Sequence, residues 1–328
     1  MQSIPCFYHP TTVILIDDDQ DFLDSLQLAL APHYKTKAFI SPQTAQQFIE
    51  EDYKKYLARK NNYLKVAYES LAEFHVSVAI SSIYQMLFDL HRFAQVMVAI
   101  IDYDMPETNG LDLARQLKAQ TPIKIIMLTG EADQSIAVRA LNHQVIDCFI
   151  LKSAKSHTKE LLKHCARLQQ DYFVELSRGI LESLNSEGKH PLQDRDFISM
   201  FHRLCTARHI VEFYLVDESG SFILLNATGQ PTWLIVRTQS DMQTFYELAE
   251  NETNTSTKLL IALRNREKIV RFQSLKEADT SVESWILHDA TQLAHKEIYY
   301  CVLQGSEGYD MDIHRVESYT DFLRLAYR

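Results

Sequence analysis

The sequence predicts an α/β fold: a doubly wound, five-stranded parallel sheet with a long helical insertion before its third strand, followed by an α+β domain with an antiparallel sheet. Three observations in the 328 residues predict it. Short apolar runs alternate with segments of helical periodicity over the first half, as in βαβ units. Four of these runs end abruptly at a polar residue. Beyond a polar linker at 186–191, apolar runs are joined by short glycine-containing turns, which indicates antiparallel strands.

Five segments in the first half are expected to form the parallel strands, and the apolar runs among them are typical of strands that are covered on both faces. They are residues 13–16, 34–40, 96–101, 123–128 and 145–151. Helices are expected between them at 21–31, 111–120 and 133–141, and Ser41-Pro42 supplies the N-cap and first position of another. This alternation implies right-handed crossovers between neighbouring strands.

The crossover before the third strand is unusually long. It has 55 residues, 41–95, where a dozen would suffice, and no glycine or proline occurs between Gln43 and Met105. Apolar residues recur at helical spacing through 43–95, which predicts either one long helix or a helical hairpin. We favour a hairpin broken near Asn61-Asn62 or within Val76–Ser82. Its role, extra packing or docking of a partner, stays open.

A long helix is expected after the fifth strand. Between Ala154 and Leu184, apolar residues recur at steps of three and four, at Leu161, Cys165, Leu168, Tyr172, Leu176, Ile180 and Leu184. That spacing is typical of a seam that packs against another helix, although ordinary packing onto the sheet gives the same pattern. Because the segment is longer than packing onto the sheet requires, we interpret it as a connecting helix that also dimerises.

Bulk composition bounds the function. Five scattered cysteines suit a reducing, cytoplasmic environment and argue against a disulfide framework or a zinc site. No apolar run approaches the length of a membrane span, and no signal peptide is recognisable. Residues 211–328 hold 18 acidic against 11 basic residues, a balance that disfavours DNA as a partner, because phosphate contacts dominate such binding.

Polar residues follow four of the predicted parallel strands, and such strand ends lie on one edge of a sheet, where α/β proteins bind ligands. They are Asp17 with Asp18, then Asp102, Thr129 and Lys152. Together they predict a phosphoryl-acceptor site, with Asp102 as the nucleophile that forms an aspartyl phosphate. Asp17 and Asp18 would join Asp102 in holding Mg²⁺ through oxygen ligands. Lys152 would offset the added charge, and Thr129 would hydrogen-bond a phosphoryl oxygen.

These residues resemble the CheY-like receiver domain of two-component response regulators, over residues 12 to about 165. Four segments carry the resemblance: Ile16-Asp-Asp-Asp19, Asp102-Tyr-Asp-Met-Pro-Glu-Thr-Asn-Gly110, Leu128-Thr-Gly130 and Phe149-Ile-Leu-Lys152. They occur in the family's order on the matching elements. The sequence differs in having Ser153, where the family usually has a proline that often follows a cis bond, and the acidic Asp104, where an apolar residue is commoner.

The resemblance implies roles for single residues. The phosphoacceptor would be Asp102 and the metal-binding acidic pair Asp17 and Asp18, with the backbone carbonyl of Asp104 completing the Mg²⁺ shell. Thr129 would be the hydroxyl switch residue and Phe149 the aromatic one. A sensor histidine kinase would donate the phosphoryl group. The face formed by the fourth helix, fifth strand and fifth helix would then change its partner preference. Beyond this phosphoacceptor chemistry we expect no enzyme.

Domain boundaries follow from these assignments. We expect a receiver domain over 1–155 with its insertion at 43–95, a connecting helix and linker over 156–190, and an α+β output domain over 191–328. In the output domain, helices are expected at 195–209, 241–250 and 318–327. Strands are expected at 211–216, 222–225, 233–236, 268–272 and 298–303.

The output domain carries no motif that assigns its function: it has neither a basic helix-turn-helix nor a cyclase or phosphodiesterase signature. We favour a module for dimerisation or partner binding that the receiver switches. Two alternatives remain, a nucleotide or small-ligand binding domain that is a degenerate enzyme, and an atypical DNA binder. The architecture as a whole also resembles the Lqs-type quorum-sensing response regulators of bacteria.

Overall fold

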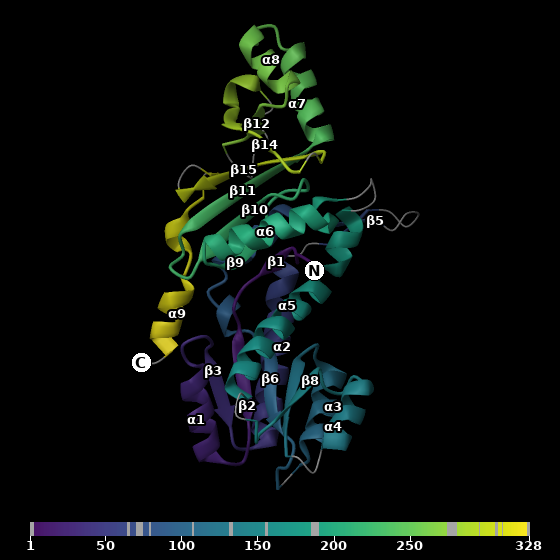
Figure 1. Cartoon of the computed structure of the whole chain (residues 1–328), viewed down its shortest axis with the longest axis vertical. Helices are drawn as coiled ribbons and strands as arrows, with labels where there is room; N and C mark the ends of the chain where they lie inside the picture. The colour runs from purple at the N-terminus through teal and green to yellow at the C-terminus, as the bar shows by residue number, and fades with distance from the viewer. Residues whose placement is uncertain are drawn as a thin grey trace. The chain divides into compact units, whose positions relative to one another are not determined.

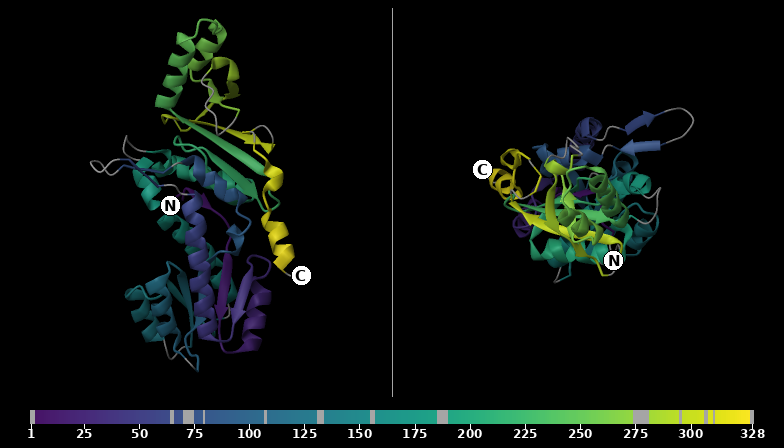
Figure 2. Two further views of the ribbon diagram at one scale, coloured as in Figure 1. Left: turned by 180° about the vertical axis from the view of Figure 1, so that it is seen from behind. Right: turned by 90° about the horizontal axis from the view of Figure 1, so that it is seen from above.

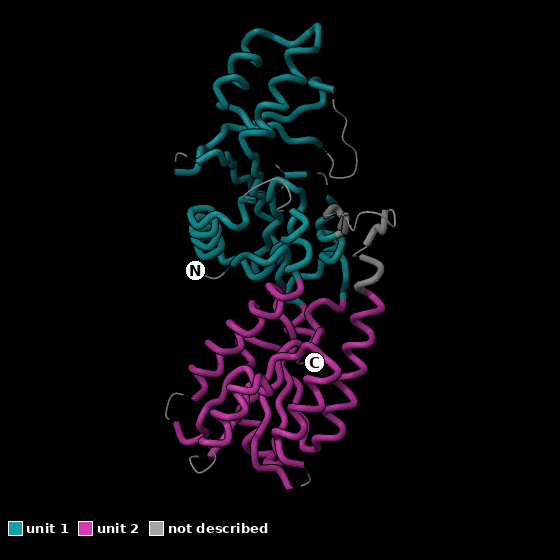
Figure 3. The backbone as a smooth tube through the Cα atoms, turned by 90° about the vertical axis from the view of Figure 1, so that its right-hand side faces the viewer, with its two compact units in different colours: residues 1–8, 63–90, 177–321 teal, residues 9–62, 91–176, 322–328 magenta. Residues whose placement is uncertain are grey.

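The computed structural model describes residues 3–63, 66–69, 75–78, 80–106, 108–130, 134–154, 157–184, 190–273, 281–294, 296–305, 308–309 and 311–326. Contacts divide them into two compact units, coloured separately in Figure 3. One unit holds residues 9–62, 91–176 and 322–328, and contains a parallel sheet. The other holds residues 1–8, 63–90 and 177–321, and contains a larger antiparallel sheet. No helix among the described residues is long and apolar enough to cross a membrane.

The five-stranded parallel sheet predicted from the sequence is confirmed. Its strands lie in the order β3-β2-β6-β7-β8 and every neighbouring pair is parallel. Their bounds are β2 Thr12–Ile16, β3 Thr36–Phe39, β6 Val96–Asp102, β7 Lys124–Thr129 and β8 Cys148–Leu151. Every residue of β2, β6 and β7 is buried, which is why these strands are apolar except at their ends, where Thr12, Asp102, Lys124 and Thr129 lie.

Helices cover both faces of this sheet (Figure 1). Their bounds are α1 Gln20–Leu30, α2 Pro42–Tyr63, α3 Gly110–Gln120, α4 Gln134–Asn142 and α5 His157–Leu184. One core cluster joins side chains of α1 and α5 to the sheet, and a second joins those of α2, α3 and α4 to the opposite face. The doubly wound arrangement of the prediction is therefore present.

The seam predicted on the helix after the fifth strand is buried within the chain. Leu161, Cys165 and Leu168 of α5 belong to the core cluster on the sheet, and Tyr172 and Ile180 are buried as well. Because these side chains are covered within the chain, their spacing does not by itself indicate a dimer contact, and dimerisation stays a prediction. Ordinary amphipathic packing, extended along a 28-residue helix, accounts for the spacing.

The insertion is helical only in part. After α2 come the strands β4 Val66–Glu69 and β5 His75–Val78, and then the 3₁₀ helices η1 Ile80–Phe88 and η2 Arg92–Ala94. β4 and β5 pair antiparallel and lie side by side in Figure 2. The predicted helical hairpin is therefore wrong at these strands. Valines at 66, 76 and 78 lose side-chain freedom in a helix and favour a pleated strand.

The antiparallel sheet of the other unit has six strands in the order β1-β9-β10-β11-β15-β14. Their bounds are β1 Phe7–Tyr8, β9 Ile210–Leu215, β10 Phe222–Asn226, β11 Pro231–Thr238, β14 Thr291–Gln292 and β15 Ile298–Gln304. The predicted meander is β9-β10-β11. Helix α6, Arg195–Ala207, packs on this meander through Phe201. The centroid of the Phe201 ring lies 5.0 Å from the ring centroids of Phe213 and Phe222.

A smaller layer completes this unit. It comprises α7 Gln239–Asn251, α8 Thr257–Arg264, and the paired strands β12 Lys268–Arg271 and β13 Ile286–Asp289. Its own small core gathers Ala249, Leu263, Val270 and Trp285. The remaining elements are short: η4 Pro191–Gln193, η5 Val282–Ser284, η7 Ile313–Arg315 and α9 Tyr319–Ala326. The sequence had not predicted α8, β13 or β14.

The division into units differs from the predicted domain boundaries at three places. Residues 1–8 and 63–90 group with the antiparallel sheet, although the sequence placed them with the receiver, and residues 322–328 group with the parallel sheet. The division within α5 falls at residue 176, inside the predicted connecting segment. β1 explains the first difference, because Phe7 and Tyr8 pair with Tyr214 and Phe213 of β9.

Candidate functional site: a carboxylate cluster at the ends of parallel strands

Three of the predicted carboxylates meet at one edge of the parallel sheet. Asp17 directly follows β2, and Asp102 is the last residue of the neighbouring strand β6. Ligand atoms of Asp17, Asp18 and Asp102 all lie within 4.8 Å of one another. Asp17 is 2% exposed and Asp102 5%, whereas Asp18 is exposed. Two nearly buried carboxylates this close repel each other unless positive charge lies between them.

Lys152 supplies that charge. It follows β8, where its backbone N–H donates to the carbonyl oxygen of Thr129 at 3.0 Å. Its Nζ lies 2.8 Å from Asp17 Oδ2 and 2.9 Å from Asp102 Oδ1, so one ammonium bridges both carboxylates. The five-strand order β3-β2-β6-β7-β8 brings these three residues together although 135 positions separate Asp17 from Lys152.

The acidic turn after β2 is held by its own hydrogen bonds. The Asp19 backbone N–H donates to Asp17 Oδ1 at 2.9 Å, which fixes the Asp17 carboxylate. Asp19 is in turn the N-cap of α1, and its Oδ1 accepts from the Phe22 N–H at 3.1 Å. The hydrogen bonds that fix the Asp17 carboxylate therefore also fix the first turn of α1.

The turn after β6 depends on Gly110. A Cβ atom at this position would overlap the backbone carbonyl oxygen of Asp102, so only glycine lets α3 begin so close to the site. The Gly110 N–H donates to the Tyr103 carbonyl at 2.9 Å, and Asn109 caps α3 by accepting from the Leu111 N–H at 2.8 Å. These bonds fix the loop that follows Asp102.

The other predicted site residues occupy the expected elements. Thr129 ends β7 fully buried, and its hydroxyl donates to the Gly130 carbonyl oxygen at 3.1 Å. Phe149, on β8, is half-buried against the core. Asp104 is exposed in the loop after β6. No cis peptide bond occurs in the described part of the chain, so Lys152 and Ser153 are joined by a trans bond.

Burial and ion pairing act in opposite directions on the pKa values of the site. Burial raises the pKa of Asp102 above its ordinary value, and the hydrogen bond from Lys152 only partly offsets this. Burial alone would lower the pKa of Lys152, but its hydrogen bonds to Asp17 and Asp102 outweigh burial and raise it. At neutral pH the ammonium is therefore held charged, beside a carboxylate that is costly to ionise.

The donor set fits a hard divalent cation. Carboxylate oxygens from three residues, one of them exposed to water, are the ligands that Mg²⁺ prefers, and no thiol or imidazole contributes to the cluster. Among the described residues, no other group of three or more His, Cys, Asp or Glu side chains is close enough to hold a metal ion. Cys6, Cys148, Cys165, Cys205 and Cys301 are all free thiols.

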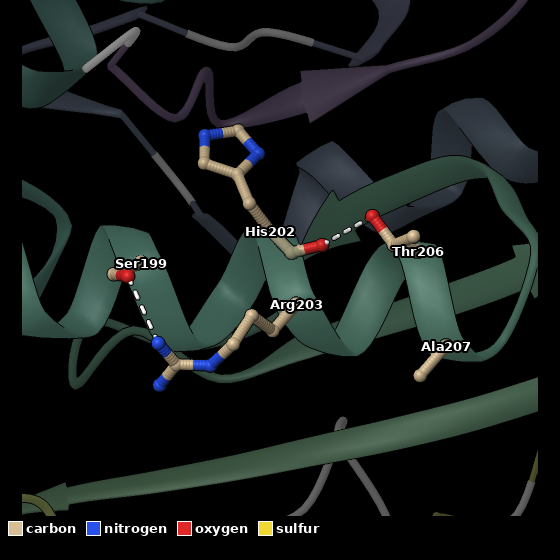
Figure 4. A pocket seen from close by; sticks show the side chains of 5 residues that line it. All are labelled: Ser199, His202, Arg203, Thr206 and Ala207. Carbon is tan, nitrogen blue, oxygen red and sulfur yellow. Dashed lines mark hydrogen bonds between the residues drawn. The ribbon is translucent and has the colours of Figure 1, made fainter.

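A separate hollow of about 430 Å³ lies along α6 in the other unit. Figure 4 shows the side chains that line it, Ser199, His202, Arg203, Thr206 and Ala207. Arg203 Nη1 donates to Ser199 Oγ at 3.0 Å, and the Thr206 hydroxyl donates to the His202 carbonyl at 2.9 Å. All five residues belong to one helix, so the hollow lacks the converging groups of a ligand site.

Sequence reasoning missed two residues beside the carboxylates. One is Asp19, which holds Asp17 and caps α1, and which the run of three aspartates had included without a separate role. The other is Phe22, whose ring lies beneath the Lys152 ammonium, 4.7 Å from Nζ. Helical spacing marked Phe22 only as an apolar position, and no sequence signal tells which apolar side chain will face a lysine on another element.

Comparisons with known proteins identify a receiver domain in this chain. A family described as the response regulator receiver domain matches residues 61–165. Chemotaxis protein CheY1 of Helicobacter pylori is 31% identical over 107 residues, 32% of this chain and 78% of CheY1. The structure of the Legionella pneumophila response regulator LqsR matches with a TM-score of 0.77 and 29% identity, over 98% of this chain and 97% of that one.

The family match begins inside the insertion and leaves out Asp17 and Asp18, which the fold nevertheless brings beside Asp102. The parallel sheet, the order of its strands and the likeness to CheY1 all identify the same domain. The chain therefore belongs to the response regulators that carry a CheY-like receiver domain.

Proposed function

We propose that Asp102 is the phosphoacceptor, and that a sensor histidine kinase is the partner that donates the phosphoryl group. The observation that carries this proposal is the Lys152 ammonium bridging Asp17 and Asp102, which puts a nucleophilic carboxylate beside a fixed positive charge. Catalysis of phosphoryl transfer rests on such positioning and charge, with little covalent work for the protein.

The transfer requires no further reactant. A carboxylate oxygen of Asp102 attacks the phosphorus atom of the donor phosphohistidine and forms a P–O bond. The P–N bond breaks, its electron pair stays with the imidazole, and a proton from solvent neutralises that ring. Lys152 remains beside the new acyl phosphate and offsets its negative charge. Thr129 turns its hydroxyl from Gly130 to a phosphoryl oxygen, and Phe149 moves inward behind it.

Mg²⁺ fits the same cluster. Asp17, Asp18, Asp102 and the backbone carbonyl of Asp104 would hold it, and the ion would supply positive charge that offsets the oxygens of the incoming phosphoryl group. Asp17 would then share its carboxylate between the ion and Lys152, whose bond to Asp102 holds the ammonium at the site. Removal of the metal by EDTA is therefore expected to stop phosphorylation while the fold persists.

Asp102→Asn tests the proposal. The variant keeps the size of the side chain but lacks the nucleophilic oxygen, so acetyl phosphate with Mg²⁺ should add about one phosphoryl group per wild-type chain and none to the variant. Intact-mass spectrometry measures the uptake. Asp112→Asn is the matched control, because Asp112 is an exposed aspartate of α3 that pairs with Arg115. Equal uptake by Asp102→Asn and wild type would remove Asp102 from this role.

We further propose that phosphorylation switches dimerisation or partner binding through a face that includes α4. Two large apolar side chains three residues apart, Val138 and Leu141, are 41% and 37% exposed on this helix. Apolar side chains held in water on one helix face favour association with another protein surface. The output module then acts through protein contacts. Quorum sensing in the cytoplasm is the proposed setting, resting on the resemblance to Lqs-type regulators.

Light scattering with beryllofluoride, which mimics the acyl phosphate, tests this second step. The wild type should change from monomer to dimer when beryllofluoride and Mg²⁺ are added. Leu141→Asp should stay monomeric yet still be phosphorylated, because a charge on the apolar face opposes association. Leu28→Asp, at an α1 side chain that is 79% exposed, is the control and should dimerise. A Leu141→Asp protein that dimerises as the wild type does would exclude the α4 face.

A further inference from the structure

We propose that Phe22 is a positioning residue of the phosphoacceptor site: its ring holds the Lys152 ammonium in place for phosphoryl transfer. The inference rests on the proposed function of Asp102 and adds a residue to which neither the receiver motifs nor the carboxylate cluster assigns a role. The Lys152 Nζ lies 4.7 Å from the centroid of the Phe22 ring, within the range of a cation–π contact.

The contact gives Lys152 a third anchor. Two come from the oxygens of Asp17 and Asp102, at 2.8 and 2.9 Å. The lysine side chain is 31% exposed, so without the ring its flexible four-carbon stem would be free to swing toward water. The negative face of an aromatic ring attracts the ammonium but accepts no conventional hydrogen bond from it. The three N–H groups therefore remain available to oxygens.

This property matters because Lys152 has to change partners. In the proposed reaction the ammonium shares Asp17 with the ion and gains a phosphoryl oxygen. An oxygen acceptor in the position of Phe22 would compete for the same N–H groups. The ring instead keeps the Lys152 ammonium at the site while its oxygen partners change. The side chain therefore loses less conformational entropy when each new bond forms.

Phe22 is itself held in register with the site. Its backbone N–H is bound by Asp19, whose own N–H is bound by Asp17, so one chain of hydrogen bonds links the ring to the acidic turn. The ring also packs against the core cluster under α1 and α5. On the lysine side, a trans bond leads to Ser153 where the receiver family usually has proline. The Phe22 contact adds a restraint on the lysine side chain itself.

A series of fluorinated phenylalanines at position 22 tests the proposal, because fluorine withdraws charge from the ring face with little change in size. The variants are Phe22→4-fluorophenylalanine, then the 3,5-difluoro and 3,4,5-trifluoro analogues. Each step should slow phosphorylation by acetyl phosphate, to a total of about two- to fivefold, as expected for a partly exposed cation–π contact. Each step should also move the ¹⁵Nζ resonance of Lys152, read without phosphate.

A matched control exists in the same unit. Lys37 Nζ lies 3.7 Å from the centroid of the Phe48 ring, and neither residue belongs to the carboxylate cluster. The same fluorine series at Phe48 should shift the Lys37 resonance and leave the phosphorylation rate constant unchanged. Phe22→Leu, checked for an intact unfolding transition, should show the full loss of the contact.

The outcomes separate this inference from the proposed function. A graded fall in rate together with a graded Lys152 shift supports Phe22 as a positioning residue. A flat series in a protein that is phosphorylated normally overturns the inference and leaves Asp102 in its role. If the unsubstituted protein takes up no phosphate, the proposed function fails, and with it the role of Phe22 in transfer; a graded Lys152 shift would then show the contact alone.

Discussion

The ionised Asp102 carboxylate lowers the free energy of unfolding. Its raised pKa means that the folded chain binds its proton more readily than the unfolded chain does, because burial outweighs the attraction of Lys152. The ionised carboxylate therefore destabilises the fold at neutral pH. This penalty disappears as the pH falls through the raised pKa toward the ordinary value. The role proposed for Asp102 as a nucleophile beside an ammonium would account for this cost.

Asp102→Asn is accordingly expected to raise the thermal unfolding midpoint in Mg²⁺-free buffer at pH 7, because the neutral amide removes the buried charge and its oxygen still accepts from Lys152. The gain should shrink in acid, where wild-type Asp102 is protonated too. Differential scanning calorimetry at several pH values measures it. A variant that is less stable than the wild type at pH 7 would show that the ion pair outweighs the burial.

Gly110 is a second residue whose substitution is expected to disturb the site directly. Gly110→Ala would place a methyl group against the Asp102 carbonyl oxygen, so the strand end and the first turn of α3 would have to separate. We expect a loss of stability of about 2 kcal/mol or more, as for other overpacked sites, together with slower phosphorylation. Urea unfolding and acetyl phosphate uptake measure the two effects. Unchanged uptake would show that the turn does not position Asp102.

At the scale of elements, the sequence predicted β2, β6 and β7 because burial on both faces leaves the central residues of each strand as an apolar run. The site followed from that, since a polar residue directly after such a run must lie at the sheet edge. β4 and β5 were missed because apolar spacing across 43–95 fits helix as well as strand. β1 was missed because two residues carry no periodicity, and only pairing with β9 makes them a strand.

The contact of Phe22 with Lys152 could not be predicted, for a related reason. It depends on where a side chain of α1 and the end of β8 meet in space. The spacing of residues along one element does not predict which residues of another element it will contact. Asp19 is intermediate: its place before α1 predicts an N-cap, but its bond to Asp17 belongs to the folded turn.

His9 packs against two elements of the receiver unit, α5 and η2, and is expected to make this packing sensitive to acid. Its ring is fully buried, with its centroid 4.8 Å from that of Phe173 on α5 and 6.3 Å from that of Phe93 on η2, and Nδ1 donates to the Pro10 carbonyl. Burial lowers its pKa to about 3. Near pH 6.5 the unfolded chain therefore binds a proton at His9, whereas the folded chain does not. The free energy of unfolding falls as the pH drops below 6.5.

We expect this group to account for a loss of about 2 kcal/mol between pH 6.5 and pH 5, at about 1.4 kcal/mol per pH unit. His9→Gln keeps an N–H donor and does not titrate, so its stability should decline less over the same interval. Urea unfolding at pH 7, 6 and 5 compares the two proteins. Parallel declines in wild type and variant would assign the acid sensitivity to other groups.

At the scale of the whole molecule, the chain passes between the two units five times, and each unit contains a terminal segment. Residues 1–8 belong with the antiparallel sheet, where the Leu215 N–H donates to the Cys6 carbonyl at 2.8 Å and the Cys6 N–H donates to Ser177 Oγ at 2.8 Å. β1 then leads within a few residues to β2 and Asp17. One short segment of chain thus connects the edge of the antiparallel sheet to the strand that precedes Asp17.

Deletion of residues 1–8 should therefore weaken the antiparallel sheet before the parallel sheet of the receiver. Without β1, the amides of β9 lose their partners and should exchange hydrogen faster, while those of β2 and β6 keep their protection. Hydrogen exchange with mass spectrometry measures both in one experiment. The opposite edge strand, β14, is the internal control. Unchanged exchange in β9 would mean that β1 contributes no stability to this sheet.

The most direct measurement of the central claim is to locate the phosphoryl group. Borohydride reduces an aspartyl phosphate to homoserine, so treatment of the protein after acetyl phosphate and Mg²⁺ marks the acceptor for peptide mass spectrometry. We expect homoserine at position 102 and unmodified aspartate at 17, 18 and 104. Homoserine at any of those three positions, or at none of the aspartates in a protein that retains its fold, would contradict the account.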